Sequence, residues 1–258
     1  MKIKRINPNH FAAYDEDGRC VGKSSIQKRN LSRIYPDCPV EYRIAISCDE
    51  ESRDLLCGAA VTRARILAAG ETEPCRVCAE VRPEDREILA LLESLGFRVK
   101  DSLTRMSRSV DNSPVLVPIP KDCTIVRDFL ENKDEFEKCL KRYNECFGTK
   151  CSREWLKALT EKPDFVRILM VSPAGLCGEL LAWSSGSSGV IGTLQVARSW
   201  RRMGVATYLM EDVRKYFSTL NLRTILFDAR VSAPGVVPLA KKTGYHPSEP
   251  LILYPELY

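Results

Sequence analysis

The chain has 258 residues, of which 44% are hydrophobic and 28% are charged, a composition typical of a globular protein with one large or two ordinary domains. It contains no segment that predicts a membrane span, and its basic start lacks the apolar core of a signal peptide, so we expect a cytoplasmic protein. The formal net charge of +5 is small, and no basic face with interleaved aromatic residues is present, which argues against nucleic-acid binding.

The 11 cysteines are odd in number and scattered along the chain, so we expect reduced, apolar side chains rather than a disulfide framework. The one close pair, Cys75 and Cys78, lies in an expected strand, where an offset of three places the two side chains on opposite faces. With only His10 and His246 as histidines, the sequence predicts no metal site.

The first half of the chain alternates strand and helix patterns. Asp17-Gly18 marks the turn of an initial hairpin, and Gly96 ends the last helix of this half. In chain order, the expected elements are a hairpin over 11–26, a strand over 40–47, a helix over 49–70, a strand over 75–81, a helix over 82–97 and a strand over 98–107.

The second half follows a similar order but has two additional helices after its first strand. Asn132 and Ser152 are expected N-caps, and Gly148 is expected to end the first of the two helices. The expected elements are a strand over 123–129, helices over 132–148 and 152–162, three antiparallel strands within 165–198, a helix over 204–219, a strand over 223–231, a helix over 234–245 and a strand over 250–254.

Both halves close with strand, helix, strand, helix and then a glycine followed by an aromatic residue, which indicates an internal repeat. The segment between the halves contains Pro114, Pro118 and Pro120 and is expected to be a linker. The sequence therefore predicts a first domain over 1–110, a linker over 111–122 and a second domain over 123–258.

A basic turn precedes the helix expected at Gly204. The N-terminus of a helix presents unpaired N–H groups and a partial positive charge, so phosphate binds there when side chains leave room. No Gly-Lys-Ser/Thr motif for a triphosphate and no Gly-x-Gly-x-x-Gly motif for a dinucleotide is present. A pyrophosphate of another cofactor therefore fits this turn best, and its residues are Arg201, Arg202, Met203, Gly204, Val205 and Ala206.

This turn, the strand that precedes it and the order of elements around it resemble the GNAT superfamily of acyl-CoA-dependent N-acetyltransferases over about Cys123 to Tyr258. The superfamily signature is Arg or Gln, two residues, Gly, one residue, and Gly or Ala. The first half resembles the same fold without its opening helices, so the chain looks like a tandem GNAT protein. The resemblance implies an α+β fold with two GNAT-like domains, each a mixed, mostly antiparallel sheet flanked by helices.

The resemblance also implies acetyl-CoA as co-substrate. The turn from Arg201 to Ala206 would hold the pyrophosphate, and the backbone of Leu194 and Val196 would pair with the pantetheine arm. Thr207 would add a hydroxyl to a phosphate or, alternatively, be merely solvated. In the first half, Asp49 and its acidic neighbours stand at the matching position and repel phosphate, so we expect that half to be a scaffold or a wall of the substrate cleft.

The catalytic groups follow less directly. The resemblance implies that the backbone N–H of Val196 polarises the thioester carbonyl. The position of the tyrosine that serves as the acid in many members is Ala240 here and Leu92 in the first half, so the acid would be a tail tyrosine, Tyr254 or Tyr258, or a water.

Two carboxylates on expected strands are the catalytic candidates. Glu179 is either the base or a solvated or edge-strand carboxylate. Asp228 lies in an apolar run, where a buried acid is either functional or paired with Arg230 on the same strand face. Tyr245 is expected in the core, and His246 in a surface loop.

The helices from Asn132 to Lys162 form the acceptor side in the family, which makes Tyr143, Asn144 and Trp155 candidate substrate-binding residues. Trp183, near the end of an expected strand, is the fourth. None of them identifies the acceptor, and the oligomeric state is not predicted.

The leading hypothesis is direct transfer of an acetyl group from acetyl-CoA to a primary amine. The alternative is a non-catalytic acyl-CoA-binding or interaction module, which the missing tyrosine favours.

Overall fold

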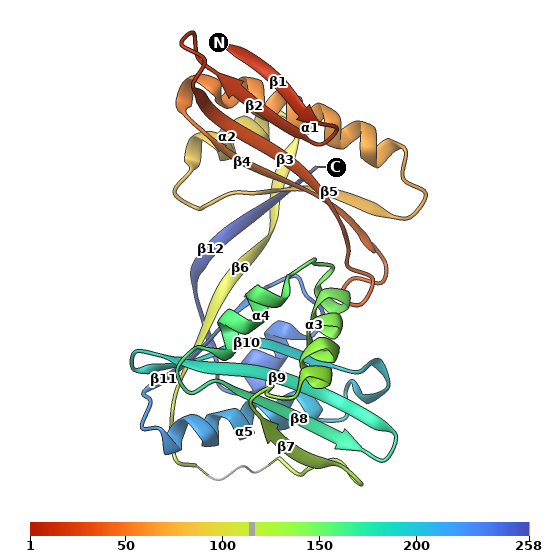
Figure 1. Cartoon of the computed structure of the whole chain (residues 1–258), viewed down its shortest axis with the longest axis vertical. Helices are drawn as coiled ribbons and strands as arrows, with labels where there is room; N and C mark the ends of the chain where they lie inside the picture. The colour runs from red at the N-terminus through yellow and green to blue at the C-terminus, as the bar shows by residue number, and fades with distance from the viewer. Residues whose placement is uncertain (114–116, 258) are drawn as a thin grey trace. The chain divides into compact units, whose positions relative to one another are not determined.

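Two structural units are present in the computed structural model, which describes residues 1–113 and 117–257. Unit 1 consists of Met1–Leu103, Arg230–Pro234 and the described residues from Pro250 onward, and unit 2 of Thr104–Ala229 and Gly235–Glu249. These limits differ from the predicted boundaries, because three strands contribute residues to both units (Figure 1): β6 (Phe97–Ser109), β11 (Thr224–Arg230) through its last residue, and β12 (His246–Leu257).

The start of the predicted linker over 111–122 is held by hydrogen bonds from Arg214. Arg214 donates hydrogen bonds to the carbonyl oxygens of Asp111 and Ser113, both over 2.6 Å, and its side chain is buried. Residues 114–116 of this linker, which include Pro114, lie outside the described residues.

Unit 1 begins with a strand that the sequence analysis did not predict. Lys2–Asn7 forms β1, an exposed edge strand in which basic residues interrupt the apolar alternation. The other elements follow the predicted order and are β2 (His10–Tyr14), β3 (Cys20–Asn30), β4 (Val40–Cys48), η1 (Glu50–Ser52), α1 (Arg53–Ala69), β5 (Cys75–Glu80) and α2 (Arg86–Ser94).

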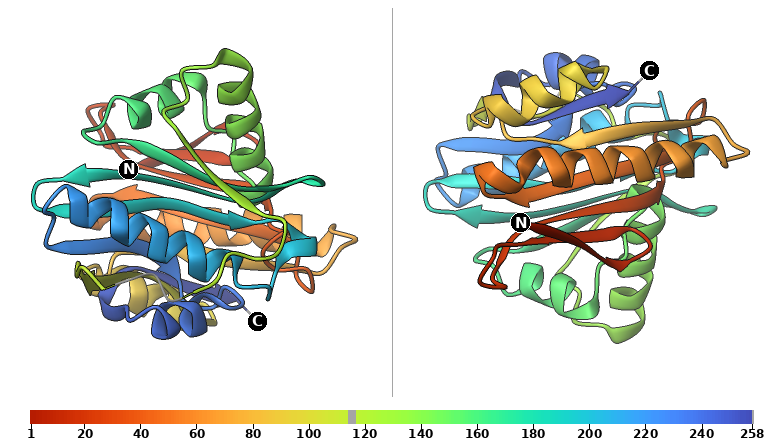
Figure 2. Two further views of the ribbon diagram at one scale, coloured as in Figure 1. Left: turned by 90° about the horizontal axis from the view of Figure 1, so that it is seen from below. Right: turned by 90° about the horizontal axis from the view of Figure 1, so that it is seen from above.

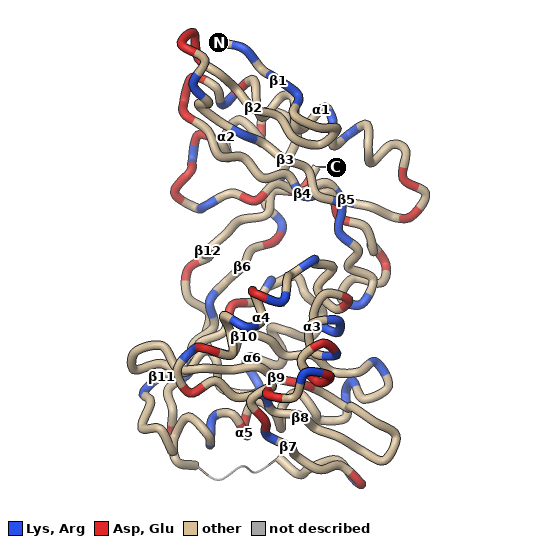
Figure 3. Tube along the Cα trace, in the orientation of Figure 1, with Lys and Arg blue, Asp and Glu red and all other residues tan. Residues whose placement is uncertain are grey.

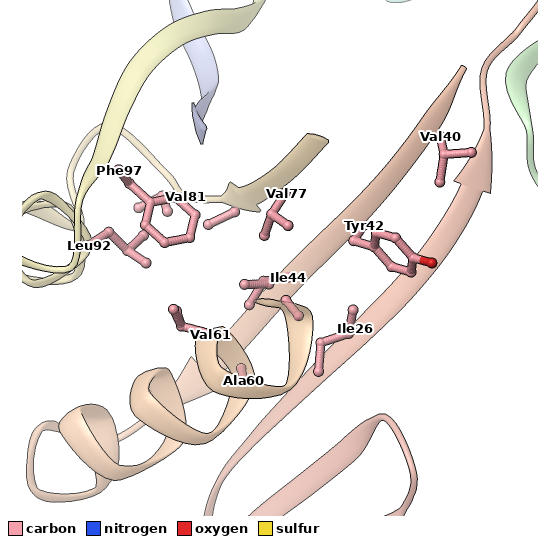
Figure 4. Packing of buried hydrophobic residues seen from close by; sticks show 12 residues of the cluster. Ile26, Val40, Tyr42, Ile44, Ala60, Val61, Val77, Val81, Leu92 and Phe97 are labelled. Atoms are coloured by element: carbon pink, nitrogen blue, oxygen red, sulfur yellow. The ribbon is translucent and has the colours of Figure 1, made fainter. Parts of the chain in front are cut away.

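The sheet of unit 1 has the strand order β1-β2-β3-β4-β5-β12-β6, in which β4–β5 is parallel and β1–β2, β2–β3, β3–β4 and β5–β12 are antiparallel. Helix α1 packs on one face of this sheet, where alternate residues of β4 form the core with small residues of the helix (Figure 4). This core includes Tyr42, Ile44, Ala60, Ala64 and Val77.

The opposite face of the same strands carries charge instead of apolar side chains. Glu41, which alternates with the core residues of β4, is fully buried and pairs with Arg43, Arg76 and Arg230 at 2.7, 2.9 and 2.6 Å. In the described part of unit 1, no helices correspond to the two that follow the first strand of unit 2. This face of the sheet therefore does not pack on an apolar helix, and its buried charges are paired with one another.

Unit 2 contains the two additional helices. Its elements are β7 (Thr124–Asp128), α3 (Lys133–Phe147), α4 (Arg153–Thr160), β8 (Val166–Ser172), β9 (Gly175–Ser185), β10 (Ser188–Val196), η2 (Arg198–Trp200), α5 (Val205–Thr219), β11 (Thr224–Arg230) and α6 (Val236–Lys242).

Three helix ends in unit 2 are those that the sequence predicts. The Asn132 side chain accepts hydrogen bonds from the first-turn N–H groups of Asp134 and Glu135, and the Ser152 side chain accepts one from Trp155. Gly148 ends α3 in the left-handed region with φ of 58°.

The sheet of unit 2 has the order β12-β6-β11-β10-β9-β8-β7, with α3 and α4 on one face and α5 on the other (Figure 2). Leu181 of β9 packs with Leu140 of α3 and Leu156 of α4. On the other face, a Cβ at Gly178 of β9 would lie only 2.7 Å from Val205 of α5, so the missing side chain allows α5 to approach the sheet.

The internal repeat is visible in this packing. Gly22 on β3 has the same role in unit 1 as Gly178 in unit 2, since a Cβ there would lie 2.6 Å from Leu56 of α1.

Basic and acidic residues are interspersed along both units (Figure 3). In the part of the chain that the structure describes, no helix has the length and apolarity needed to cross a membrane.

Candidate functional site

Strand β10 separates from β11 halfway along its length. The parallel register between them runs from Ser188↔Thr224 to Ile191↔Phe227, whereas the antiparallel pairing of β10 with β9 continues to Val196↔Gly178. The pairing with β9 is irregular between Ile191 and Thr193. A bulge of this kind bends the strand, so residues 192–196 present an edge on the β11 side.

The backbone groups that face this edge can be assigned from the register. The N–H of Ala197 donates to the carbonyl oxygen of Cys177 on β9 over 2.9 Å. Because the peptide groups of a strand point alternately to its two sides, those of Leu194 and Val196 face away from β9. Consistent with this, Nε of Arg201 donates to the carbonyl oxygen of Val196 over 3.4 Å.

The basic turn leads directly from this edge into α5. Gly204 is the N-cap of α5 and has φ of 85°, a left-handed conformation that favours glycine. Nothing lies within 4 Å of a Cβ built on Gly204, so the approach to the first-turn N–H groups is open. Arg201 and Arg202 are exposed, and Arg202 is also left-handed, with φ of 67°.

The other predicted residues of the turn divide between surface and core. Met203 is 53% exposed, whereas Val205 is buried against Gly178. Ala206 is partly buried. Thr207 is buried, so the expectation that it is merely solvated is wrong, because the first turn of α5 packs on the sheet.

Glu179 is neither a solvated nor an edge-strand carboxylate, as the sequence analysis had allowed. It lies on the inner strand β9 and is 0% exposed. Arg142 of α3 donates two hydrogen bonds to its oxygens, over 3.0 and 2.8 Å, and Arg167 of β8 donates a third over 2.7 Å. Gln195, directly opposite on β10, donates a fourth over 3.2 Å.

Arg167 extends this network to the first strand and helix of unit 2. Its two terminal nitrogens donate to Asp128 over 3.2 Å and to Glu135 over 3.0 Å. Side chains of β7, β8, β9, β10 and α3 are thereby joined around Glu179. Sequence reasoning missed this network, because arginines on separate elements give no local pattern.

Asp228 does not have the predicted environment. It is exposed and forms a bidentate pair with Arg105 of β6, over 2.8 and 3.0 Å, rather than with Arg230. Arg230 pairs with Glu41 and Asp101 of unit 1. The apolar run around Asp228 therefore misled the prediction of burial, since β11 leaves this side chain at the surface.

The predicted acceptor-side residues lie together on the face that carries α3 and α4. The rings of Tyr143 and Trp155 are 4.4 Å apart, and Trp183 packs against the same hydrophobic cluster. Asn144 does not contribute a free amide, because its side chain binds the N–H and carbonyl of Cys151 in the loop between the helices. Nζ of Lys162, which sequence reasoning did not single out, lies 4.3 Å from the centre of the Trp183 ring.

Ala240 occupies the position at which the resemblance places the acid. Ala240 is buried, and Tyr245 is buried with its ring 5.0 Å from that of Phe227, as expected for a core residue. Tyr254 is buried within unit 1, 4.2 Å from the guanidinium of Arg230. Tyr258 lies outside the described residues.

His246 is exposed, but it begins β12 rather than lying in a loop.

In unit 1 the position that corresponds to the basic turn is acidic. Asp49 is the N-cap of η1, which continues into α1, and Glu50 and Glu51 lie in its first turn. The β4–β5 register also extends further than that of β10–β11, from Val40↔Cys75 to Ala45↔Glu80. The matching position of unit 1 therefore has a longer paired stretch between its parallel strands and negative charge at the helix start.

Residues 130–245 match the model of the Acetyltransferase (GNAT) family. They belong to the GNAT superfamily. A GCN5-related N-acetyltransferase from Sphaerobacter thermophilus is similar over 98% of this chain and 81% of its own, with 17% identity and a TM-score of 0.56. A protein from Enterococcus faecalis described as a probable N-acyltransferase is similar over 95% of this chain and 61% of its own, with 10% identity and a TM-score of 0.57.

A tandem GNAT protein of the clavulanic acid biosynthesis pathway is similar over 96% of this chain and 81% of its own, with 14% identity and a TM-score of 0.46, too low to support an argument. No curated protein sequence matches the chain. The likeness in fold to the Sphaerobacter thermophilus protein extends over both units, and the predicted α+β fold with mixed sheets is confirmed.

Proposed function

We propose that unit 2 binds acetyl-CoA and transfers its acetyl group directly to a primary amine. The observation that carries this proposal is the continuity between an open strand edge, formed by residues 192–196, and an unobstructed helix start at Gly204. The edge offers the peptide groups of Leu194 and Val196 to an extended amide chain such as pantetheine. The helix start offers N–H groups to a pyrophosphate at the end of that chain.

Charge supports the same assignment. Arg201 and Arg202 precede the N-terminus of α5, so side-chain and helix-dipole charges have the same sign around the phosphate position. In unit 1, acidic residues occupy the matching position, and we infer one acetyl-CoA site per chain.

The proposed reaction is an attack of the neutral amine nitrogen on the thioester carbon. The C–N bond forms, the C–S bond breaks, and the departing thiolate takes up a proton. An N–H of the open β10 edge stabilises the oxyanion without any special side chain. Glu179 is held by two arginines and Asp228 by one, so we assign the transfer of the amine proton to water rather than to either carboxylate.

Calorimetric titration with acetyl-CoA tests the binding step. The wild type is expected to show one site per chain, and the double variant Arg201→Ala, Gly204→Ala to lose most of the affinity. Arg153→Ala is a suitable control, because this arginine is an exposed residue of α4. Absence of binding by the wild type, or an unchanged affinity in the double variant, would refute the proposal.

A second function, acyl-CoA binding without catalysis, is favoured by one observation. Ala240 stands at the position of the acid that many family members use, and Glu179, the candidate base, is fully buried and paired with arginines. Turnover of acetyl-CoA with a panel of polyamines, amino sugars, amino acids and peptides distinguishes the two functions. Tight binding without amine-dependent release of CoA across this panel would support the non-catalytic function.

A further inference from the structure

Lys162 holds a primary amine of the chain itself above the ring of Trp183. Its Nζ lies 4.3 Å from the centroid of this indole. Lys162 is exposed and lies in the segment between α4 and β8, whereas Trp183 lies on β9. Because the face of an indole attracts a cation, this contact gives an exposed lysine a preferred position.

The same indole ring lies against the backbone of β10 at Gly192. A Cβ built on Gly192 would overlap the six-membered ring of Trp183, so the ring occupies the space of a missing side chain. Gly192 lies in the irregular segment between Ile191 and Thr193, just beyond the last β10–β11 pair. Trp183 therefore connects the Lys162 amine to the point where the two strands separate.

Thr193 gives an independent indication that a polar group binds at this point. It is 5% exposed, and its hydroxyl has no hydrogen-bond partner among residues 1–113 and 117–257. Thr193 pairs with Leu181, so its side chain lies on the face of Leu181 and Trp183. A buried hydroxyl without a partner is unfavourable, and a polar ligand group beside it would relieve this cost.

We propose that Lys162 is acetylated by its own chain. The inference rests on the proposed function: with the pyrophosphate at Gly204 and the pantetheine arm along Val196 and Leu194, the thioester at the end of the arm comes beside Gly192. The neutral Nζ attacks the thioester carbonyl carbon, an amide C–N bond forms, and the C–S bond breaks. The amine loses a proton, the departing thiolate takes one up, and the products are acetyl-lysine and CoA.

This modification changes the site that it occupies. Acetylation removes the positive charge of Lys162 and with it the cation–π contact to Trp183. The neutral acetyl-lysine side chain is then no longer attracted to the face of the Trp183 ring.

The test requires no knowledge of the external acceptor. The whole chain is incubated with acetyl-CoA alone, and the incorporated acetyl groups are counted by intact mass and located by peptide mapping. Lys157 is the matched internal control, since it lies on α4 and its side chain is 71% exposed. We expect incorporation at Lys162 to be at least about tenfold faster than at Lys157, because the contact with Trp183 holds Lys162 beside the proposed thioester position.

Two variants complete the experiment. Lys162→Arg retains the charge but accepts no acetyl group, so it should bind acetyl-CoA normally and lose the preferred incorporation. The variant Arg201→Ala, Gly204→Ala should reduce labelling of Lys162 to the level of Lys157. Equal labelling of both lysines in the wild type, or labelling that persists in this double variant, would overturn the inference. Binding of acetyl-CoA without labelling of Lys162 would overturn it alone, whereas absence of binding would overturn the proposed function as well.

Discussion

Nε of Arg167 lies 2.7 Å from Oε1 of Glu179, and both side chains are buried between the sheet of unit 2 and α3. Four hydrogen bonds from protein groups converge on this carboxylate, so its oxygens are already occupied by partners within the protein. Glu179 is paired across the strands with Gln195, the residue between Leu194 and Val196 on β10. We therefore regard Glu179 as a residue that fixes the β10 edge and α3.

Glu179→Ala is expected to lower the free energy of unfolding by roughly 3–5 kcal/mol, because it removes the buried carboxylate that pairs with both the buried Arg167 and the partly buried Arg142. Denaturant unfolding of the wild type and the variant measures this difference. Glu161→Ala is the control, since Glu161 is an exposed residue whose pair with Lys157 should contribute less than about 1 kcal/mol. A loss at Glu179 no larger than that at Glu161 would contradict the structural role.

Local signals in the sequence were sufficient to predict most of the fold. Asn132, Ser152 and Gly148 act within one or two turns of their own helices, so their side-chain or backbone preferences predicted the helix ends that the structure has. The strand β1 was missed, because an exposed edge strand needs no apolar alternation. The extent of β12 was underestimated for the same reason, since its first residues are exposed.

The candidate site was predictable only where it depends on the backbone. Gly204 and the basic residues before it are contiguous, and the open edge of β10 adjoins them. The partners of Glu179 and Asp228 come from other elements, so a strand pattern alone assigned the wrong environment to both carboxylates. Only tertiary packing brings Arg142 to Glu179 and Arg105 to Asp228.

The buried charge cluster of unit 1 should make stability depend on acid pH. Burial alone would raise the pKa of Glu41, but Arg43, Arg230 and Arg76 outweigh it and lower the pKa from 4.5 to about 2. Because the pKa in the folded state is depressed, the stabilisation is complete above pH 4.5 and is lost as the pH falls toward 2. The shift corresponds to about 3 kcal/mol.

Urea unfolding at several pH values between 5 and 2.5 measures this contribution for wild type and Glu41→Gln. The variant should be less stable at pH 5 and should lose less stability than the wild type on acidification, because it has no proton to bind at this position. Parallel pH dependences of the two proteins would show that Glu41 is not the group responsible.

Cysteine reactivity provides a further test of the packing. Burial raises the pKa of the Cys57, Cys78 and Cys139 thiols from 9.0 to about 12. The thiolate is the reactive form, so each should react with iodoacetamide about a thousandfold more slowly than an ordinary thiol, apart from any steric protection. Peptide mapping after brief native labelling should find Cys20, which is exposed, modified first. Early modification of the three buried thiols would contradict the packing around them.

Two glycine-to-alanine substitutions should have opposite effects on stability. A Cβ at Gly178 would lie 2.7 Å from Val205, 3.0 Å from Leu209 and 3.2 Å from the carbonyl oxygen of Gln195. Gly178→Ala therefore forces α5 away from the sheet and should cost about 1–3 kcal/mol. Gly58 lies within α1 with nothing within 4 Å of its Cβ position, so Gly58→Ala should add about 0.5–1 kcal/mol through helix propensity.

Thermal unfolding of the two variants measures the expected loss and the expected gain of stability in one experiment. Because α5 begins at the basic turn, Gly178→Ala should also weaken the binding of acetyl-CoA, whereas Gly58→Ala, in unit 1, should leave it unchanged. If Gly178→Ala retained wild-type stability and affinity, α5 would not need its close approach to β9. The helix start would then be positioned by the turn from Arg198 to Gly204 rather than by packing on the sheet.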